Sequence, residues 1–508
     1  MLHSMNIIIE EGICMNPYIW KLYLEAGGRE TVAFFQQQFT HGINEEYTEK
    51  IKEFLQAYCA CSELIDESIY NIQDAITDIN NDPDFMRENE SSEKQERFIS
   101  NQLTAIWDQY CEEFGNPKEA FLNISASISY ISTIIAYDYP EIFIPYYFRC
   151  NYNVLEIIAE SFSINLPVIP SKKDYEKRFY YYGDICKALH EYRLINNWSP
   201  YELLAFLYDF APKYIGGIDS YIIKDLPEPK SAFFVGGGGN NADREAENDK
   251  DMISFWQCNP DTRAGDMIVM YLTTPISSIS SIWRSCSIGF NDPFFFYYRC
   301  TYICNPIKGK RIGLREIKTD KVLGQMPIVA KNMQGINGVE LKPSEYNHIL
   351  DITKSTALKI EYSADIQENE YSSEKEVEDN IIKPFLRKMG YTEDDYTQQL
   401  RIDVGNHNSL LIPDFVLLPN QIGRNKTAFA VIEAKRSITN IKDRDAALGQ
   451  ARSYAKQLGA RYSAVVSQEK LWITSIESDY SELLQEWAWS KLGNLDNFML
   501  VRHVLEKR

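Results

Sequence analysis

The chain has few of the residues from which metal and disulfide sites are built. Only six histidines occur in 508 residues, and they are scattered along the sequence. Ten cysteines are present, but no CxxC pair accompanies them. We therefore expect neither a zinc site nor a disulfide framework. The thiols are interpreted as buried and reduced, as in a cytoplasmic protein.

Long apolar segments are also missing. No run of about 18 apolar residues occurs, so we expect no membrane-spanning segment. A short NIII run near the N-terminus is followed at once by Glu10 and Glu11, and no basic region precedes it. We therefore expect no signal peptide.

Nucleotide-binding motifs are absent as well. Four consecutive glycines follow the apolar run AFFV, but they lack the Lys-Ser/Thr pair of a P-loop and the spacing of a dinucleotide-binding turn. They are interpreted as a loop after a strand. No helicase or NTPase motif is present, so we expect that cutting does not itself require ATP unless a partner supplies that activity.

Positive charge is scarce overall and unevenly distributed. The net charge is -20, with 52 Lys and Arg against 72 Asp and Glu. Residues 61–120 hold 15 acids and 4 bases, whereas residues 429–462 hold 7 bases and 3 acids. The balance argues against a protein that coats nucleic acid along its whole surface, but it leaves room for a local basic site.

The length indicates two to four domains, and three patterns divide the chain. Residues 1–225 place apolar residues at helical intervals, and Ser199-Pro200-Tyr201-Glu202 has the form of a helix-capping box. Residues 226–352 hold short strand-like runs, among them DMIVMYLT, SSIWRSCSI and FFFYYRCTYIC. After a polar linker, residues 371–508 alternate helix and strand, which predicts a mixed sheet flanked by helices.

Two apolar runs of the last segment carry carboxylates next to a lysine. Asp414 interrupts LLIPDFVLL, Glu433 follows FAVI, and Lys435 comes two residues later. Carboxylates from neighbouring strands can converge on a hard cation such as Mg2+. Side chains two apart on a strand share a face, so Lys435 can approach a metal-bound water. The pattern predicts hydrolysis at phosphorus, with a metal-free ion pair as the alternative interpretation.

Pro413-Asp414 and Glu433-Ala434-Lys435 together resemble the PD-(D/E)xK motif of the restriction-endonuclease-like superfamily. The order of elements over residues 372–476 is similar to the N-terminal nuclease domain of type I restriction motor subunits. The resemblance implies Mg2+ or Mn2+ as cofactor. The metal ligands that it implies are Glu374, Asp414 and Glu433. The catalytic residues that it implies are Asp414, Glu433, Lys435, Gln450 and Tyr454.

Two of these assignments depend on flanking segments. SEKEVEDNIIKPFLRKMGY resembles the opening helix of such a nuclease domain, where Glu374 would take the place of the helix acid. Glu376 and Glu378 lie close by, and the helical phase leaves the choice among the three open. Gln450 and Tyr454 match a QxxxY element and share a helix face. They are expected to orient Lys435 or to touch the DNA backbone.

Basic residues near the motif suit contacts to phosphate. Arg436, Arg452 and Lys456 are the candidates for the DNA backbone. Ordinary solvated charges are the alternative interpretation.

The middle segment is similar to the EVE and YTH domains of the PUA-like superfamily. The residues that carry this similarity are AFFVGGGGN, ISFWQCNPDTRAGDMIVMYLTTP and MQGINGVELKPSEYNHIL. Such domains hold a modified base between aromatic faces, with polar groups reading its edge. The implied contacts are Trp256, Trp283, Phe255, Asn240 and Ser254. Tryptophans packed in the core of a β domain are the alternative.

Taken together, the sequence predicts a multidomain protein with three parts: an all-α N-terminal region, a β-rich EVE-like domain and an α/β nuclease domain. We expect a modification-dependent DNA endonuclease of bacterial anti-phage defence. Double-strand cutting normally needs two active sites, which favours a homodimer. A nuclease effector activated by a signal or a partner is one alternative, and a non-catalytic nucleic-acid-binding protein is another. The choice between DNA and RNA stays open.

Overall fold

The computed structural model describes residues 15–81, 95–238, 249, 251–364, 366, 369–404, 409–422, 425–477 and 481–507. The chain divides into two compact units. The first comprises residues 1–341 with 350–358, and the second comprises residues 342–349 with 359–508. The predicted boundary at residues 225 and 226 lies inside the first unit.

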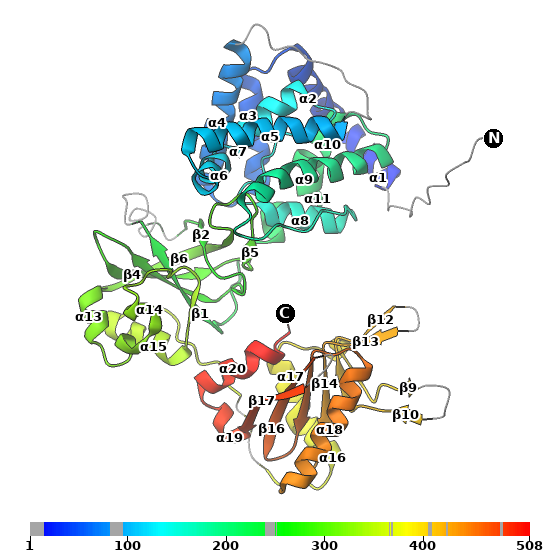
Figure 1. The fold of residues 1–508 in the computed structure, drawn as a ribbon, viewed down its shortest axis with the longest axis vertical. Coiled ribbons are helices and arrows are strands. Elements are labelled where there is room, and N and C mark those ends of the chain that lie inside the picture. The colour runs from blue at the N-terminus through cyan, green and yellow to red at the C-terminus, as the bar shows by residue number, and fades with distance from the viewer. Residues whose placement is uncertain are drawn as a thin grey trace, which may run out of the picture. The chain divides into compact units, whose positions relative to one another are not determined.

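The first unit begins with helices, as predicted (Figure 1). Its helices are α1 (Pro17–Tyr23), η1 (Leu24–Gly28), α2 (Arg29–His41), α3 (Glu45–Tyr58), α4 (Ser62–Asn81), α5 (Gln95–Phe114), α6 (Pro117–Ala126), α7 (Ile128–Asp138), α8 (Tyr152–Ser161), α9 (Tyr175–Ile195), α10 (Pro200–Ala205), η3 (Phe206–Phe210), α11 (Ala211–Tyr214) and η4 (Gly217–Ser220). The capping box is confirmed: the Glu202 backbone N–H donates to Ser199 Oγ, and the Ser199 N–H donates to the Glu202 carboxylate.

No single described helix is long and apolar enough to span a membrane. Helices α6 and α7 reach that length only together, across a bend of 75°.

A curled sheet completes the first unit. Its elements are β1 (Ala232–Gly237), β2 (Ser254–Gln257), β3 (Met267–Leu272), β4 (Ser278–Ser285), β5 (Phe290–Asn291), β6 (Arg299–Gly313), α13 (Leu314–Thr319), η5 (Leu323–Gln325), α14 (Pro327–Ala330) and β7 (Val339–Leu341). The strand order is β2-β6-β4-β3-β1-β7, with β1 and β3 parallel. The indole N–H of Trp256 on β2 donates to the Gly236 carbonyl on β1 at 3.3 Å, so the sheet curls back toward its far edge.

One predicted strand begins later in the chain than expected. The run FFFYYRCTYIC was interpreted as strand throughout, but β6 begins only at Arg299. The preceding Phe294–Tyr298 segment forms turns, because the buried Asp292 carboxylate accepts hydrogen bonds from the N–H groups of Phe294 and Phe295 at 2.8 and 3.0 Å.

A buried arginine ties this turn segment to the helices. Arg178 on α9 is 0% exposed, and its guanidinium donates to the carbonyls of Pro293 and Phe295 at 2.9 and 2.6 Å. It also lies 4.2 Å from the centre of the Phe121 ring. Burial lowers the pKa of Arg178 to about 10, so it remains cationic at neutral pH.

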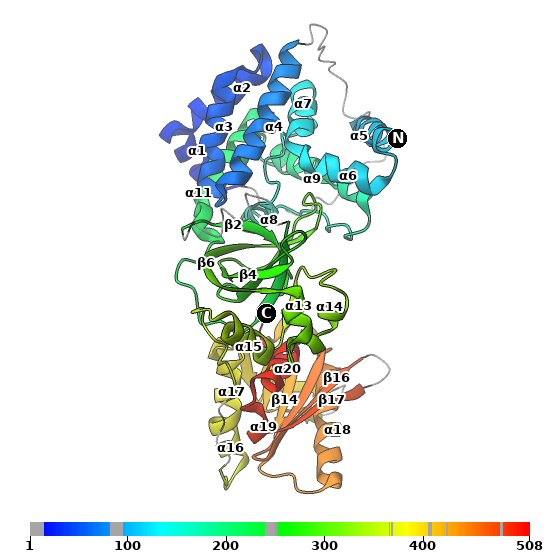
Figure 2. The same cartoon turned by 90° about the vertical axis from the view of Figure 1, so that its left-hand side faces the viewer.

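Helix α8 lies beside the sheet at β5 (Figures 1 and 2).

The second unit is an α/β domain built on a six-stranded sheet. Helix α15 (Pro343–Thr353) spans the boundary between the units. The remaining elements are α16 (Glu374–Val377), η6 (Glu378–Ile382), α17 (Lys383–Lys388), η7 (Glu393–Asp395), β8 (Tyr396–Gln398), β9 (Ile402–Val404), β10 (Ser409–Leu411), β11 (Phe415–Leu417), β12 (Asn420–Ile422), β13 (Asn425–Thr427), β14 (Ala430–Ala434), α18 (Ile441–Gln457), β15 (Tyr462–Val466), β16 (Lys470–Ile476), β17 (Ser481–Ala488), α19 (Trp489–Leu492) and α20 (Leu495–Leu505).

Helices cover both faces of this sheet, as the sequence predicts (Figure 1). The order is β17-β16-β15-β14-β11-β8, with β14 and β15 parallel and the other pairs antiparallel. Phe415 and Ile432 face a core shared with α17, α19 and α20, whereas Val416 and Val431 face α18. The alternation of buried side chains along β11 and β14 therefore decides which residues reach each face.

The nine described cysteines form no disulfide, and eight of them are buried. Their burial agrees with the expectation of buried thiols. Cys14 lies outside the described residues.

Candidate active site

The register of β11 and β14 brings the two predicted strand carboxylates together. Phe415 pairs with Ile432 in this antiparallel ladder, so Asp414, one residue before β11, comes opposite Glu433. Side chains directly opposite each other lie about 4.5–5.5 Å apart at their Cβ atoms. Asp414 Oδ2 also accepts a hydrogen bond from the Ala434 N–H at 2.7 Å, which fixes the carboxylate against the next strand.

Glu433 occupies a poorly solvated position. It is 3% exposed, and its Oε1 accepts a hydrogen bond from Lys435 Nζ at 2.7 Å. Its other oxygen, Oε2, is buried and has no hydrogen-bond partner. Burial raises the pKa of Glu433 to about 7, and the nearby Asp414 and Glu374 carboxylates raise it further, against the lowering effect of Lys435. A buried carboxylate oxygen without a partner calls for a cation or a donor.

Lys435 lies among the carboxylates, on the same face as Glu433 as predicted. Its Nζ is 2.7 Å from Glu433 and 4.0 Å from Glu374. Partial burial acts to lower the pKa of Lys435, but the bond to Glu433 and the surrounding carboxylates outweigh it and raise the pKa. The side chain is therefore a cation at neutral pH.

The neighbouring carboxylates also act on Asp414. Burial raises its pKa, and Glu378 and Glu374 add to the increase, while the Ala434 N–H and Lys435 oppose it. Four carboxylates and one ammonium thus share this corner of the sheet. Protons or a cation would relieve the mutual repulsion of the carboxylates.

The three helix glutamates that the sequence left open have different environments. Glu374 has an exposed side chain, and Glu376 caps the helix by accepting from the Ser372 N–H at 2.6 Å. Glu378 is buried at 7% exposure, where it accepts from Lys375 Nζ at 2.9 Å and Gln398 Nε2 at 3.3 Å. Glu378 also begins the π-helical turn η6, which shifts the phase of the helix.

The donor set suits a hard divalent cation only in part. Carboxylate oxygens are the ligands that Mg2+ prefers, and Glu433 Oε2 is a buried oxygen without a partner. Among the described residues, however, no three His, Cys, Asp or Glu side chains are gathered closely enough to hold a metal ion. Asp414 and Glu433 therefore fit as two ligands. The structure does not bring the predicted third ligand, Glu374, into a cluster with them.

The predicted residues on α18 lie one turn apart and contact each other. Gln450 Nε2 donates to Tyr454 Oη at 2.9 Å, and Tyr454 is 8% exposed against the face of the sheet that carries Val431. In the part of the chain that the structure describes, no hydrogen bond joins either residue to Lys435. Arg436 and Lys456 are exposed, and Arg452 is half-buried on α18.

A turn that the sequence analysis did not single out supports the segment after β14. The Glu469 carboxylate accepts hydrogen bonds from Ser437 Oγ, the Ile438 N–H, Ser467 Oγ and Gln468 Nε2. Partial burial raises the pKa of Glu469, but these bonds outweigh it and lower the pKa. The segment that carries Lys435 is thereby attached to the β15–β16 turn. This attachment is visible only in the fold, because no sequence motif includes Glu469.

The described base-reading candidates lie on β2 and β4, and the three on β2 alternate between its two faces. Trp256 is half-buried, and it packs against an interior cluster that includes Trp283, which is 1% exposed. Phe255 points to the opposite side, where it packs on Phe295 with ring centroids 4.8 Å apart. Ser254 is buried, at 3% exposure. Asn240 lies outside the described residues.

These positions separate the candidates. Adjacent strand residues face opposite ways, so Trp256 and Phe255 cannot belong to one cage. Trp283 is 1% exposed and shows no ring face at the surface, so Trp256 is the one of the two predicted tryptophans that stays partly exposed.

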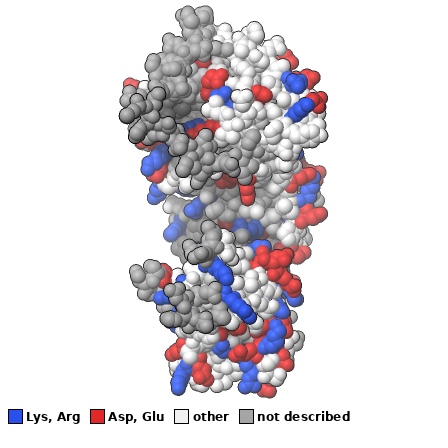
Figure 3. Space-filling model, turned by 90° about the vertical axis from the view of Figure 1, so that its right-hand side faces the viewer, with Lys and Arg blue, Asp and Glu red and all other residues white. Residues whose placement is uncertain are grey.

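Surface charge is mixed on the face drawn in Figure 3. Acidic and basic side chains are interspersed there. This distribution agrees with the expectation that nucleic acid does not coat the whole surface.

Comparisons with known proteins identify no family for the chain. No protein-family model matches the chain, and no curated protein matches it. One solved structure shows a likeness, the crystal structure of a mutant ZmASCH protein from Zymomonas mobilis. It is 13% identical, covers 25% of this chain and 99% of that chain, and has a TM-score of 0.18. At that TM-score the likeness carries no argument about fold or function.

Proposed function

We propose that the second unit is a metal-dependent nuclease and that the chain acts as a modification-dependent DNA endonuclease of anti-phage defence. The observation that supports the nuclease most is the meeting of Asp414, Glu433 and Lys435 at the end of two adjacent strands. The resemblance to the PD-(D/E)xK motif gives this arrangement its chemical interpretation.

Asp414 and Glu433 would hold Mg2+ or Mn2+ through carboxylate oxygens, and Glu378 and Glu374 supply further negative charge at its rim. When bound, the metal would polarise the phosphate and activate a water. Lys435 is a cation beside these groups, so its part is to stabilise the negative charge that develops on phosphorus. The Ala434 N–H fixes Asp414 through Oδ2, so Oδ1 would be the oxygen left to bind a metal.

The proposal of a base reader rests on the resemblance and on Trp256. This indole is half-buried at the curled sheet, with its N–H directed to the Gly236 carbonyl. A ring held in this way could stack on a base that has left its duplex. The modified-base requirement is the finer part of the proposal, and it can fail while the nuclease stands.

The test is a cleavage assay on the full chain with Mg2+ and four matched DNAs: unmodified, 5-methylcytosine, 5-hydroxymethylcytosine and glucosylated. We expect cleavage of modified DNA only, and a loss of about 100-fold or more in Glu433→Gln and Lys435→Met. Glu482→Gln makes the same charge change on β17, three strands from β14, and should cleave like the wild type.

The outcomes separate the two parts of the proposal. Equal cleavage of all four DNAs would keep the nuclease and remove the reader. Cleavage that persists in Glu433→Gln would contradict the proposed active site. No cleavage of any DNA by the wild type would overturn the modification-dependent endonuclease and favour a signal-activated effector or a fold without catalytic activity.

A further inference from the structure

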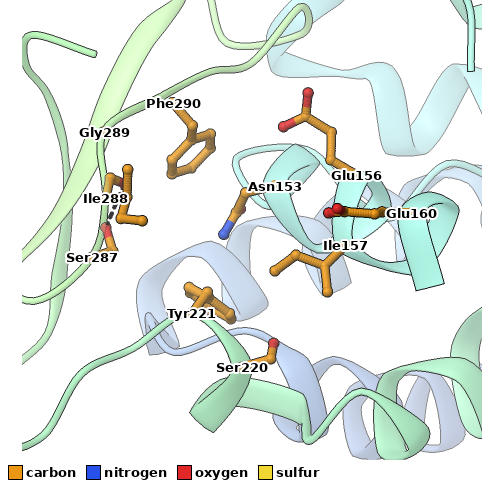
Figure 4. Close-up of a pocket in the computed structure, with 10 residues that line it drawn as sticks. All are labelled: Asn153, Glu156, Ile157, Glu160, Ser220, Tyr221, Ser287, Ile288, Gly289 and Phe290. Carbon is orange, nitrogen blue, oxygen red and sulfur yellow. Dashed lines mark hydrogen bonds between the residues drawn. The ribbon is translucent and has the colours of Figure 1, made fainter. Parts of the chain in front are cut away.

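A cavity in the first unit lies between helix α8 and the segment that leads into β5. Its volume is about 450 Å³. One wall is the face of α8 that carries Asn153, Glu156, Ile157 and Glu160, whose spacing places them on one side of the helix. Residues 287–290 form the opposite wall, and residues 220–221 close the space between the walls (Figure 4). A volume of this size suits a small organic ligand.

The polar lining of this cavity is acidic and not neutralised. Glu156 and Glu160 lie one turn apart on α8, and no Lys, Arg or His is among the ten lining residues. Neither carboxylate forms an ion pair with any residue that the structure describes. Both glutamates are exposed residues, but desolvation of the Glu156 carboxyl beside the protein raises its pKa to about 7, and the nearby Asp292 adds to the effect. Two such carboxylates repel phosphate and carboxylate ligands and favour a cation.

A hydrogen-bonding group and apolar walls complete the lining. The Asn153 side chain reaches the cavity with its amide nitrogen, whereas its Oδ1 is buried in the protein (Figure 4). Ile157, Ile288, Phe290 and the Tyr221 ring supply the apolar surface. The Tyr221 hydroxyl is already engaged, because it donates to the Tyr58 carbonyl at 2.9 Å. The acceptors that the cavity offers to a ligand are therefore the two carboxylates.

A bare metal ion does not fit this lining. Among the described residues no cluster of three ligating side chains occurs here or elsewhere. The apolar walls would also contribute nothing to an ion, whereas they would cover the body of an organic molecule.

We propose that this cavity binds a small organic cation, with an ammonium or guanidinium group held by Glu156 and Glu160 and an apolar body between Ile157 and Phe290. The proposal concerns the first unit alone and does not depend on nuclease activity.

Titration calorimetry on the full chain at pH 8 tests the charge requirement, with three phenols that differ mainly in charge. Tyramine is the cation, 4-ethylphenol is neutral and 4-hydroxyphenylacetate is the anion; agmatine and putrescine extend the cation series. We expect at least one of the three cations to bind. If it is tyramine, 4-ethylphenol should bind about tenfold more weakly or worse, since it loses a charge-assisted contact, and the anion should not bind.

Variants locate the site. Glu160→Gln and Glu156→Gln should each weaken binding of the cation about tenfold. Ser220→Tyr should weaken it by filling the cavity while both carboxylates remain. Glu191→Gln, an exposed residue of α9 outside the lining, is the matched control and should bind like the wild type. Thermal unfolding without ligand checks that each variant is folded.

Three results would overturn the proposal. They are equal affinity for tyramine and 4-ethylphenol, unchanged affinity in folded variants of both glutamates, and no binding of any of the three cations at millimolar concentration.

Discussion

At the scale of single residues, the buried histidine of the helical region connects stability to pH. His190 on α9 is 7% exposed, and its Nδ1 accepts from Arg193 Nε at 2.9 Å. Arg193 also pairs with Glu141 at 3.1 Å. Burial lowers the pKa of His190 from 6.5 to about 3, and the positive charge of Arg193 adds to this effect. The imidazole is therefore neutral in the folded protein over most of the acid range.

This shift predicts a loss of stability on acidification. Below pH 6.5 the unfolded chain protonates His190 while the folded chain does not until about pH 3, so stability falls as pH decreases through that window. The full shift corresponds to about 5 kcal/mol. His190→Asn keeps an acceptor for Arg193 and removes the titration, so its unfolding free energy should depend less on pH.

Urea unfolding at a series of pH values measures this difference. His41→Asn changes an exposed histidine of the same unit and should follow the wild type. Parallel pH profiles for wild type and His190→Asn would contradict the assignment of a neutral buried imidazole.

At the scale of secondary-structure elements, the segment after β14 depends on the turn between β15 and β16. The Lys435 N–H donates to the Val466 carbonyl at 2.8 Å. The Glu469 carboxylate accepts hydrogen bonds from Ser437 Oγ and the Ile438 N–H, which follow Lys435 in the chain. Glu469→Gln weakens that attachment without touching Asp414 or Glu433. With the proposed nuclease activity as the readout, we expect kcat to fall about tenfold to 100-fold, since the loss is one of position.

The split between kcat and KM distinguishes positioning from binding. A role in placing Lys435 lowers kcat and leaves KM nearly unchanged. Glu482→Gln again serves as the control of equal charge change. An effect on KM alone, or no effect in a folded variant, would show that Glu469 does not position the site.

The elements also show what the sequence could predict. The capping box at Ser199 and the shared face of Glu433 and Lys435 follow from local periodicity, and both are present in the structure. The placement of Asp414 opposite Glu433 depends on the register between two strands, which local sequence does not determine. Likewise, the burial of Glu378 depends on a π-helical turn that no residue pattern indicated.

Other features could not be predicted because they join distant segments. The cavity combines residues near 155, 220 and 288, and none of these stretches carries a recognisable motif. The different settings of Trp256 and Trp283 arise from the way the sheet curls, and both tryptophans look alike in the sequence. Composition predicted that tryptophans would pack, but not which one would keep an accessible ring.

At the scale of the whole molecule, the two units have separate interiors. The core of the first contains helical residues such as Tyr208 together with Phe294 and Tyr302 from the sheet domain. A core of the second is built from residues 364–505, among them Phe385 and Trp489. Because each unit has its own core, we expect calorimetry of the full chain to resolve two unfolding transitions.

One substitution in each unit assigns the transitions. Arg178→Met leaves the carbonyls of Pro293 and Phe295 buried without their donor, which should cost about 3 kcal/mol in the first unit. Phe385→Ala empties a buried position in the second unit and should cost about 3–5 kcal/mol there. Each variant should lower one transition temperature and leave the other in place. A single transition that both variants lower equally would mean that the helices, the curled sheet and the α/β domain unfold as one cooperative body.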